Sequence, residues 1–285
     1  MNKTACIIVN YNDSNRTLNL VKAIDEYTSI DWIIVIDNCS PDGSYSNLKS
    51  FESKKYYLLK AVKNGGYGYG NNLGAKKAKE LSADSILIAN PDVCFTDECI
   101  CHMKDTLAHN PSCAIVGAKE IKVGSWAWRY TSTLDDVLSA SLFFNKVQKR
   151  RYYSKEFFEG KKYAEVDIIP GCLLLVDLSK FIEIGGYDEA VFLYEEEKIL
   201  YCRLGGKYKS IVDLNVEYEH NHEESHSYTL KSMLKGKKRL LDSRVYFLKK
   251  YRKLGWPEMF LAKSFFLLTM FEMTFWWVLR RFFNR

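Results

Sequence analysis

The first 110 residues alternate short apolar runs with segments of helical periodicity, and this alternation limits the chain to few folds. Four runs are predicted to be strands: Ala5–Val9, Trp32–Ile36, Tyr56–Val62 and Ser85–Ala89. Helices are predicted between and after them, over Arg16–Tyr27, Ser44–Ser53, Asn72–Leu81 and Glu98–His109. Such alternation predicts an α/β fold, with a parallel sheet covered by helices on both faces.

The second half of the chain is less regular. Residues 120–165 show no clear period, and an apolar run over Ile168–Val176 is interrupted by Pro170-Gly171. A short helix is then expected to end at Gly185-Gly186. Two further strands are expected after it, over Ser210–Val212 and around Asn215–Tyr218.

Charge divides the chain at about residue 230. Ten Lys and Arg against one acid give residues 231–253 a net charge of +9, whereas residues 1–230 carry −5. We therefore expect a body over residues 1–230, with halves at about 1–110 and 111–230, followed by a basic and apolar helical tail over 231–285. This asymmetry indicates an anionic surface as the partner of the tail.

The tail has the composition of a membrane-associated segment. An apolar stripe at helical spacing (Leu234, Leu241, Val245 and Leu248) lies among the ten cations, and Phe265–Leu279 is apolar at nearly every position. Fifteen residues with Glu272 near their middle favour a helix that lies in the membrane surface over one that spans it. The alternative is that the tail packs on the body or on a second subunit. Nucleic acid is not the expected partner, because the aromatic and aliphatic continuation suits lipid better.

The N-terminus and the cysteines indicate the cytoplasm. The apolar stretch after Met1 is too short for a signal peptide. The eight cysteines are scattered, form no CxxC pair and are expected to be reduced thiols. Together with the tail, these features predict a protein on the inner face of the cytoplasmic membrane.

Polar residues follow each predicted strand, where ligands of parallel sheets bind. Asp37 and Asn38 could hydrogen-bond a base or ribose, or could serve only as turn and capping residues. The glycine-rich segment 64–74 could bring backbone close to a phosphate, or could be a structural loop. Its resemblance to a dinucleotide fingerprint is weak, since it follows the third predicted strand.

Two groups of titratable residues could carry chemistry. Asp92 ends the fourth strand, and His220 and His222 alternate after a predicted strand, which would place both on one face. Carboxylate and imidazole suit Mg²⁺ or Mn²⁺, although histidines on a solvated loop are the alternative. The three glutamates Glu195–Glu197 could include a general base, or could simply favour the N-terminus of a helix.

Taken together and in order, these segments resemble the family 2 glycosyltransferases of GT-A fold, and in particular their rhamnosyltransferase-like branch, which builds bacterial surface polysaccharides. The resemblance covers residues 4–228. It rests on Ile7–Asn12, Val35–Ser44, Asn64–Gly74, Leu87–Val93, Pro170–Leu173, Gly185–Glu189, Phe192–Glu197 and His220–Ser225.

The resemblance implies a Rossmann-like nucleotide-diphospho-sugar transferase that needs Mg²⁺ or Mn²⁺. Asp92 would be a metal ligand, with His220 as a further ligand and His222 as the alternative. Glu197 would be the base, with Glu196 as the alternative. The donor-binding residues would be Asn10, Tyr11, Asp37, Asn38, Asn64, Gly66, Asn72 and Asn90.

The implied reaction is an inverting transfer of a sugar, rhamnose in the resembled branch, from a nucleotide diphosphate to a hydroxyl of a saccharide or lipid-linked acceptor. UDP-linked hexoses remain open as donors. Asn90 and Glu197 stand where the family has acids of the DxD and Glu-Asp motifs. Those departures support the alternative of a non-catalytic nucleotide-sugar-binding or scaffold protein on the same fold. The tail could also mediate an oligomer.

Overall fold

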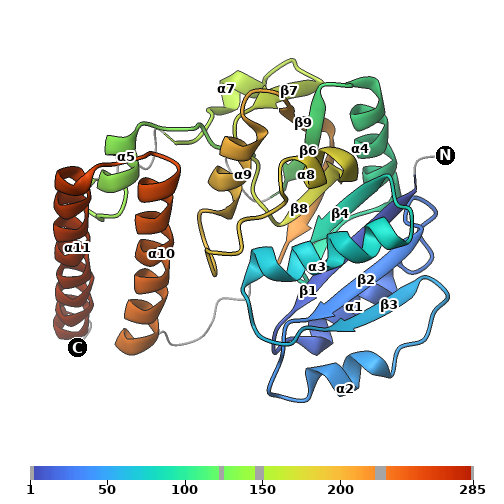
Figure 1. The fold of residues 1–285 in the computed structure, drawn as a ribbon, viewed down its shortest axis with the longest axis horizontal. Helices are drawn as coiled ribbons and strands as arrows, with labels where there is room; N and C mark the ends of the chain where they lie inside the picture. The colour runs from blue at the N-terminus through green and yellow to red at the C-terminus, as the bar shows by residue number, and fades with distance from the viewer. Residues whose placement is uncertain (1–2, 122–124, 145–150, 222–228, 284–285) are drawn as a thin grey trace.

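The computed structural model describes residues 3–121, 125–144, 151–221 and 229–283, and Figure 1 shows one α/β body with two helices beside it. The strands of the first half are β1 (Thr4–Asn10), β2 (Trp32–Asp37), β3 (Tyr56–Lys60) and β4 (Ser85–Ala89). The helices of this half are α1 (Ser14–Ile24), α2 (Ser44–Lys49), α3 (Tyr67–Glu80) and α4 (Asp97–His109). All eight predicted elements are therefore present.

All strand pairs in the first half of the sheet are parallel, whereas the second half mixes antiparallel pairs with one parallel pair. Strands β3, β2, β1 and β4 are parallel neighbours in that order, as predicted. The sheet continues with β8 (Leu173–Asp177), β6 (Cys113–Glu120), β9 (Lys209–His220) and β5 (Val93–Cys94), and β7 (Tyr163–Val166) also pairs with β9. Strand β8 is antiparallel to both β4 and β6, whereas β6 and β9 are parallel, so the complete sheet is mixed.

Both faces of the sheet are buried, which explains the uninterrupted apolar runs of its central strands. Ile7 of β1 packs in one core with Ala75 and Ala78 of α3. The next residue, Ile8, packs in a second core with Val21 of α1 and Met103 of α4. Successive residues thus point to opposite faces, each covered by helix.

Helix α3 begins at Tyr67, five residues before the predicted start, so most of the glycine-rich segment is helical. A Cβ at Gly70 would lie 2.7 Å from Cγ1 of Val9, and one at Gly74 would lie 2.4 Å from Cγ2 of Ile7. These glycines let the helix approach β1 closely. The backbone of Gly70 and Gly74 is thus part of the helix, whereas Gly65 and Gly66 precede its N-terminus.

The second half contains short elements and one long strand. The two strands expected between Ser210 and Tyr218 are a single strand, β9, which carries His220 at its end. Strand β6 was not predicted. The remaining helices of the body are α5 (Thr133–Leu138), α7 (Lys155–Phe158), α8 (Leu178–Glu183) and α9 (Glu196–Leu204).

Helices α10 (Leu230–Lys250) and α11 (Trp256–Phe283) form the tail and run side by side at the left of Figure 1. Leu241 and Leu248, part of the stripe expected to face lipid, are instead buried against Met259 and Phe266 of α11. The other face of α11 is solvent-exposed and apolar, and includes Leu261, Leu267, Leu268, Phe271 and Phe275.

The apolar helix is longer than the 15 residues expected from sequence. Among the described residues, the segment Trp256–Leu279 is long and apolar enough to cross a membrane, judged by length and composition alone. Glu272, which argued against spanning, is not an isolated charge, because its carboxylate accepts a hydrogen bond from the backbone N–H of Phe143 at 3.0 Å.

Helix α10 is joined to the body by polar contacts. Arg244, Lys250 and Arg252 form ion pairs with Glu195, Asp188 and Asp136, respectively. Arg244 and Arg252 are therefore neutralised within the protein, whereas Lys250, with 49% of its side chain exposed, is paired at the surface. The predicted boundary at residue 230 coincides with the start of α10, but the ion pairs cross it.

Candidate active site

The carboxyl ends of β1 and β2 form a buried polar network. Asn10 Nδ2 donates to Asp37 Oδ1 at 2.9 Å, and Thr17 Oγ1 donates to Asn10 Oδ1 at 3.0 Å. The second carboxylate oxygen of Asp37 accepts the backbone N–H of Ser40 at 3.1 Å. Both Asn10 and Asp37 are 0% exposed, so these side chains hold the two loops together.

Tyr11 and Asn38 are better placed to meet a ligand at this edge. Tyr11 is 46% exposed. Asn38 donates from Nδ2 to Asn64 Oδ1 and to the carbonyl of Gly66, whereas its buried Oδ1 has no hydrogen-bond partner among the described residues. A buried acceptor without a donor costs free energy, and a base or ribose donor would satisfy it.

Gly66 and Asn72 connect α3 to the segment that carries the glutamates. Gly66 has φ +89°, and a Cβ there would lie 2.1 Å from the carbonyl oxygen of Phe192. The amide of Asn72 bonds the backbone of Tyr187 in both directions and also Glu189. Asn72 is thus engaged in structural contacts, and Gly66 is required by close packing.

Asp92 and His220 lie together, as predicted, because β5 pairs with the end of β9. Oδ1 of Asp92 is 3.2 Å from Nε2 of His220. Burial lowers the pKa of His220, but hydrogen bonds and charge interactions with Asp92 and Cys172 together outweigh burial and raise the pKa to about 10. His222 lies outside the described residues.

Two further residues complete this cluster. Ligand atoms of Glu120, Cys172 and His220 all lie within 4.8 Å of one another. The Cys172 thiol is also 2.8 Å from the hydroxyl of Tyr218. Sequence reasoning missed Glu120, although a carboxylate at the end of a buried strand was the signal that singled out Asp92.

The donor set fits a divalent cation. Mg²⁺ binds oxygen ligands at about 2.1 Å, so two adjacent octahedral ligands stand about 3.0 Å apart. The separation of 3.2 Å between Asp92 Oδ1 and His220 Nε2 is close to this spacing. Carboxylate and imidazole also suit Mn²⁺.

The three glutamates have different environments. Burial would raise the pKa of Glu195, but Arg244 and Lys198, each 2.8 Å from its carboxylate, lower it to about 2. Glu195 is therefore permanently ionised and paired. Its backbone φ of +68° and that of Tyr194, +75°, are strained conformations at the turn into α9.

Glu196 and Glu197 form a coupled pair. Burial and the charge of Glu197 raise the pKa of Glu196 to about 8, and Oε1 of Glu196 has no hydrogen-bond partner among the described residues. Burial also raises the pKa of Glu197, whose Oε1 accepts the backbone N–H of Gly171 at 3.2 Å. A carboxylate poised near neutral pH is suited to proton abstraction.

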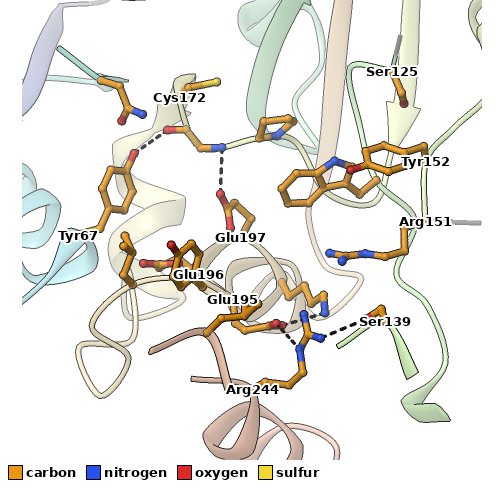
Figure 2. Close-up of a pocket in the computed structure, with 18 of the residues that line it drawn as sticks. Tyr67, Ser125, Ser139, Arg151, Tyr152, Cys172, Glu195, Glu196, Glu197 and Arg244 are labelled. Carbon is orange, nitrogen blue, oxygen red and sulfur yellow. Dashed lines mark hydrogen bonds and ion pairs between the residues drawn. The ribbon is translucent and has the colours of Figure 1, made fainter. Parts of the chain in front are cut away.

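One cavity of about 1160 Å³ brings these groups together. Its lining includes Asn90, Glu120, His220, Glu196 and Glu197. Figure 2 shows Glu197 inside it, with Tyr67 on one side and Tyr152 on the other. The nucleotide-side residues Asn10, Tyr11, Asp37, Asn38 and Asn64 do not line this cavity, so the expected site comprises a nucleotide edge and a catalytic cavity.

The α/β sheet switches from parallel to antiparallel strands at the edge where the polar residues gather. Together with an Asp–His pair and a carboxylate whose pKa is raised, this arrangement defines a nucleotide-sugar transferase fold. The sequence profile of Glycosyl transferase family 2 matches residues 5–176. The chain belongs to this family.

One curated relative is the low-salt glycan biosynthesis hexosyltransferase Agl10 of Haloferax volcanii, 26% identical over 200 residues. The match covers 69% of this chain and 59% of that protein, so the chain spans little more than half the length of this relative.

Solved structures confirm the GT-A fold. The mannosyltransferase PcManGT from Pyrobaculum calidifontis, in complex with GDP-Man and Mn²⁺, aligns with a TM-score of 0.61 at 15% identity, covering 93% of this chain and 69% of that one. GalNAc-T7 with UDP, GalNAc and Mn²⁺ gives 0.59 at 13% identity, covering 92% and 53%. Staphylococcus aureus TarS 1-349 with UDP-GlcNAc gives 0.53 at 12% identity, covering 95% and 73%.

Proposed function

We propose that this protein is an inverting, metal-dependent glycosyltransferase acting on a nucleotide-diphosphate sugar. The observation that carries the proposal is that His220, whose Nε2 is 3.2 Å from Oδ1 of Asp92, lines the same cavity as the coupled carboxyls of Glu196 and Glu197. A metal-ligating pair facing a proton acceptor is what a single displacement requires.

Glu197 takes the proton of the acceptor hydroxyl in this proposal. The hydroxyl oxygen then forms a bond to the anomeric carbon while the bond to the diphosphate breaks, with inversion. The N–H of Gly171 orients the Glu197 carboxylate, and the neighbouring Glu196 raises the proton affinity of the pair.

Asp92 and His220 would hold the divalent cation, which supplies charge stabilisation for the departing diphosphate. Tyr11 and Asn38 would contact base and ribose, with Asn64 and Gly66 at the same edge, and Asn90 would meet the donor from the cavity. Asn10 and Asp37 keep the two loops in register by their mutual hydrogen bond, and Asn72 supports the site through Tyr187.

The donor in this proposal is dTDP-rhamnose or a nucleotide-linked hexose. The relatives differ on this point: one is named a hexosyltransferase, and others were solved with GDP-Man or UDP-GlcNAc. The acceptor would be a saccharide or lipid-linked saccharide used in surface polysaccharide synthesis.

We further propose that the exposed apolar face of α11 contacts the inner leaflet of the cytoplasmic membrane. Phe271, 72% exposed, and Leu267 and Leu268, both 64% exposed, lie on this face. Arg281 lies over the ring of Trp277 at 4.8 Å, a pairing suited to the interface between lipid and water.

The test is equilibrium binding of a nucleotide-sugar panel with and without Mn²⁺, followed by transfer assays. Asp92→Ala should abolish the metal dependence of donor binding, whereas Asp105→Ala, on the exposed surface of α4, should not. Unchanged metal dependence in Asp92→Ala would refute the metal assignment. Donor binding without any transfer or hydrolysis, across panel and acceptors, would favour the non-catalytic alternative.

A further inference from the structure

Cations gather at the end of the cavity that lies next to α10. Arg151, Lys198, Lys237 and Arg244 line the cavity together with Ser139. Asn90, Glu120 and His220 line the other end, beside Asp92. The cavity is therefore polarised, with carboxylates at the metal end and positive charge near the tail.

Two of these cations are neutralised by the protein itself. Lys198 lies 2.8 Å from both Asp136 and Glu195, and Arg244 lies 2.8 Å from Glu195. Arg252 shares Asp136 from outside the cavity, at 2.7 Å. Three cations thus share two carboxylates, which leaves no negative charge in this cluster for Arg151 and Lys237.

Arg151 and Lys237 have no carboxylate ion-pair partner within the described parts of the chain. The guanidinium of Arg151 stands 5.7 Å from the ring centroid of Trp128, and Figure 2 shows it in the cavity on the side of Ser139 and Arg244. Nζ of Lys237 donates to the carbonyl of Ala140, the residue after Ser139. Lys237 therefore reaches the turn after α5, and Arg151 lies on the same side of the cavity.

Burial lowers the pKa of Lys237, and Arg244 lowers it further, whereas Glu272 acts in the opposite direction. Glu272 forms no ion pair with Lys237 among the described residues, and its Oε1 accepts a hydrogen bond from the backbone N–H of Phe143. A half-buried ammonium beside a second cation is unfavourable, and an anion bound between them would lower that cost.

We propose that Arg151 and Lys237 form a phosphate subsite for the acceptor, so that the acceptor is a saccharide carried on a phosphate ester. This inference rests on the proposed function and specifies the substrate class of the same cavity. The acid end repels the phosphate and the basic end attracts it, so the sugar hydroxyl is directed toward Glu197. The sugar would lie between the two ends of the cavity, where Trp128 and Tyr152, with ring centroids 6.5 Å apart, form an aromatic surface for it.

The phosphate could belong to a lipid carrier or to a soluble sugar phosphate. The turn after α5 adjoins α11, since the rings of Phe143 and Trp276 lie 6.2 Å apart. A lipid chain attached to the phosphate would thus leave the cavity beside the exposed apolar face of α11. The experiment below separates these two sources.

Isothermal titration calorimetry of the full chain in EDTA measures this subsite apart from the metal site. The probes are farnesyl phosphate, glucose 1-phosphate and octyl glucoside, which lacks phosphate. Lys237→Met and Arg151→Met should each weaken binding of the phosphate probes by about 10-fold or more, the usual loss for a charged hydrogen bond. Lys238→Met is the matched control, since Lys238 is exposed and paired with Asp242, and Lys237→Arg should retain binding.

Tighter binding of farnesyl phosphate supports the lipid carrier, and tighter binding of glucose 1-phosphate supports the soluble ester. Both results uphold the subsite if they depend on Lys237 or Arg151. Equal affinity in Lys237→Met, Arg151→Met and Lys238→Met, each confirmed folded by thermal unfolding, would overturn it, as would binding of octyl glucoside as tight as that of the phosphates. Failure of the proposed function would show separately, as absence of Mn²⁺-dependent nucleotide binding.

Discussion

Nε of Arg244 lies 2.8 Å from Oε1 of Glu195, and this buried ion pair joins helix α10 to the residue directly before the two candidate bases. The same helix holds the preceding turn, because Ser243 Oγ donates to the carbonyl of Leu193 at 2.8 Å. The turn between these contacts contains the strained residues Tyr194 and Glu195. Helix α10 therefore fixes the backbone that presents Glu196 and Glu197.

Replacement of Arg244 should destabilise the protein. Arg244→Met leaves the Glu195 carboxylate buried with Lys198 as its remaining cation, a change that typically costs about 3–5 kcal/mol. Chemical denaturation measures this free energy of unfolding. The double variant Glu195→Gln/Arg244→Met removes both charges and should recover part of the loss. A single variant within about 0.5 kcal/mol of the wild type would show that the pair does not hold the turn.

Glu197→Gln should lower turnover by about 100-fold or more with donor affinity nearly unchanged, since only the proton acceptor is removed. Glu196→Gln should keep turnover at high pH. It should move the acidic limb of the pH–rate profile to lower pH, because the neighbouring carboxyl that shares the proton is gone. Loss of turnover in Glu196→Gln but not in Glu197→Gln would identify Glu196 as the base.

The same pair should make stability depend on pH. The pKa of Glu196 is about 8 in the folded protein and 4.5 in its unperturbed state. The folded state therefore binds more protons than the unfolded state. The contribution of protonated Glu196 to the free energy of unfolding is complete below about pH 4.5 and is lost as pH rises to about 8. Glu196→Gln, neutral at every pH, should gain stability relative to the wild type between pH 5 and pH 9, on the order of a few kcal/mol. A difference that stays constant with pH would contradict the raised pKa.

Glutamates placed on the exposed face of α11 should release the protein from membranes. Leu268→Glu/Phe271→Glu puts two charges on that face without touching the contacts of α10 with the body. Flotation with vesicles of anionic lipid measures the bound fraction. The control is Val62→Glu/Ile182→Glu, which charges two exposed apolar residues elsewhere on the molecule. A wild-type protein that stays soluble with such vesicles at low salt would refute the membrane proposal.

The parallel half of the fold was predictable because its signals are local. Ile7 and Ile34 lie in strands buried on both faces, which read as short continuous apolar runs whatever the tertiary context. The start of α3 was not predictable in the same way. Glycine has a low helix propensity, and only the contacts of Gly70 and Gly74 with β1 show why it is used there.

Within the site, the sequence predicted Asp92 and His220 but not their neighbours. Glu120 joins them through the parallel pairing of β6 with β9, and Cys172 through the antiparallel pairing of β8 with β6, neither of which a short pattern encodes. Glu195 and Arg244 are 49 residues apart in the sequence, and Arg244 lies in a segment, residues 231–253, whose many cations indicated an exposed basic surface. The apolar stripe of α10 was likewise recognised, but its partner, α11, could be identified only from packing.

The ion pairs of α10 also determine where the molecule can be divided. Cutting before residue 231 would remove Arg244 and Arg252 and leave Glu195 and Asp136 with fewer cations. The first connection with few polar contacts to the body lies after Arg252 and before Trp256, where the chain turns from one tail helix to the next. A chimera with a foreign anchor should therefore be joined at this connection, with an apolar partner kept for Leu241 and Leu248.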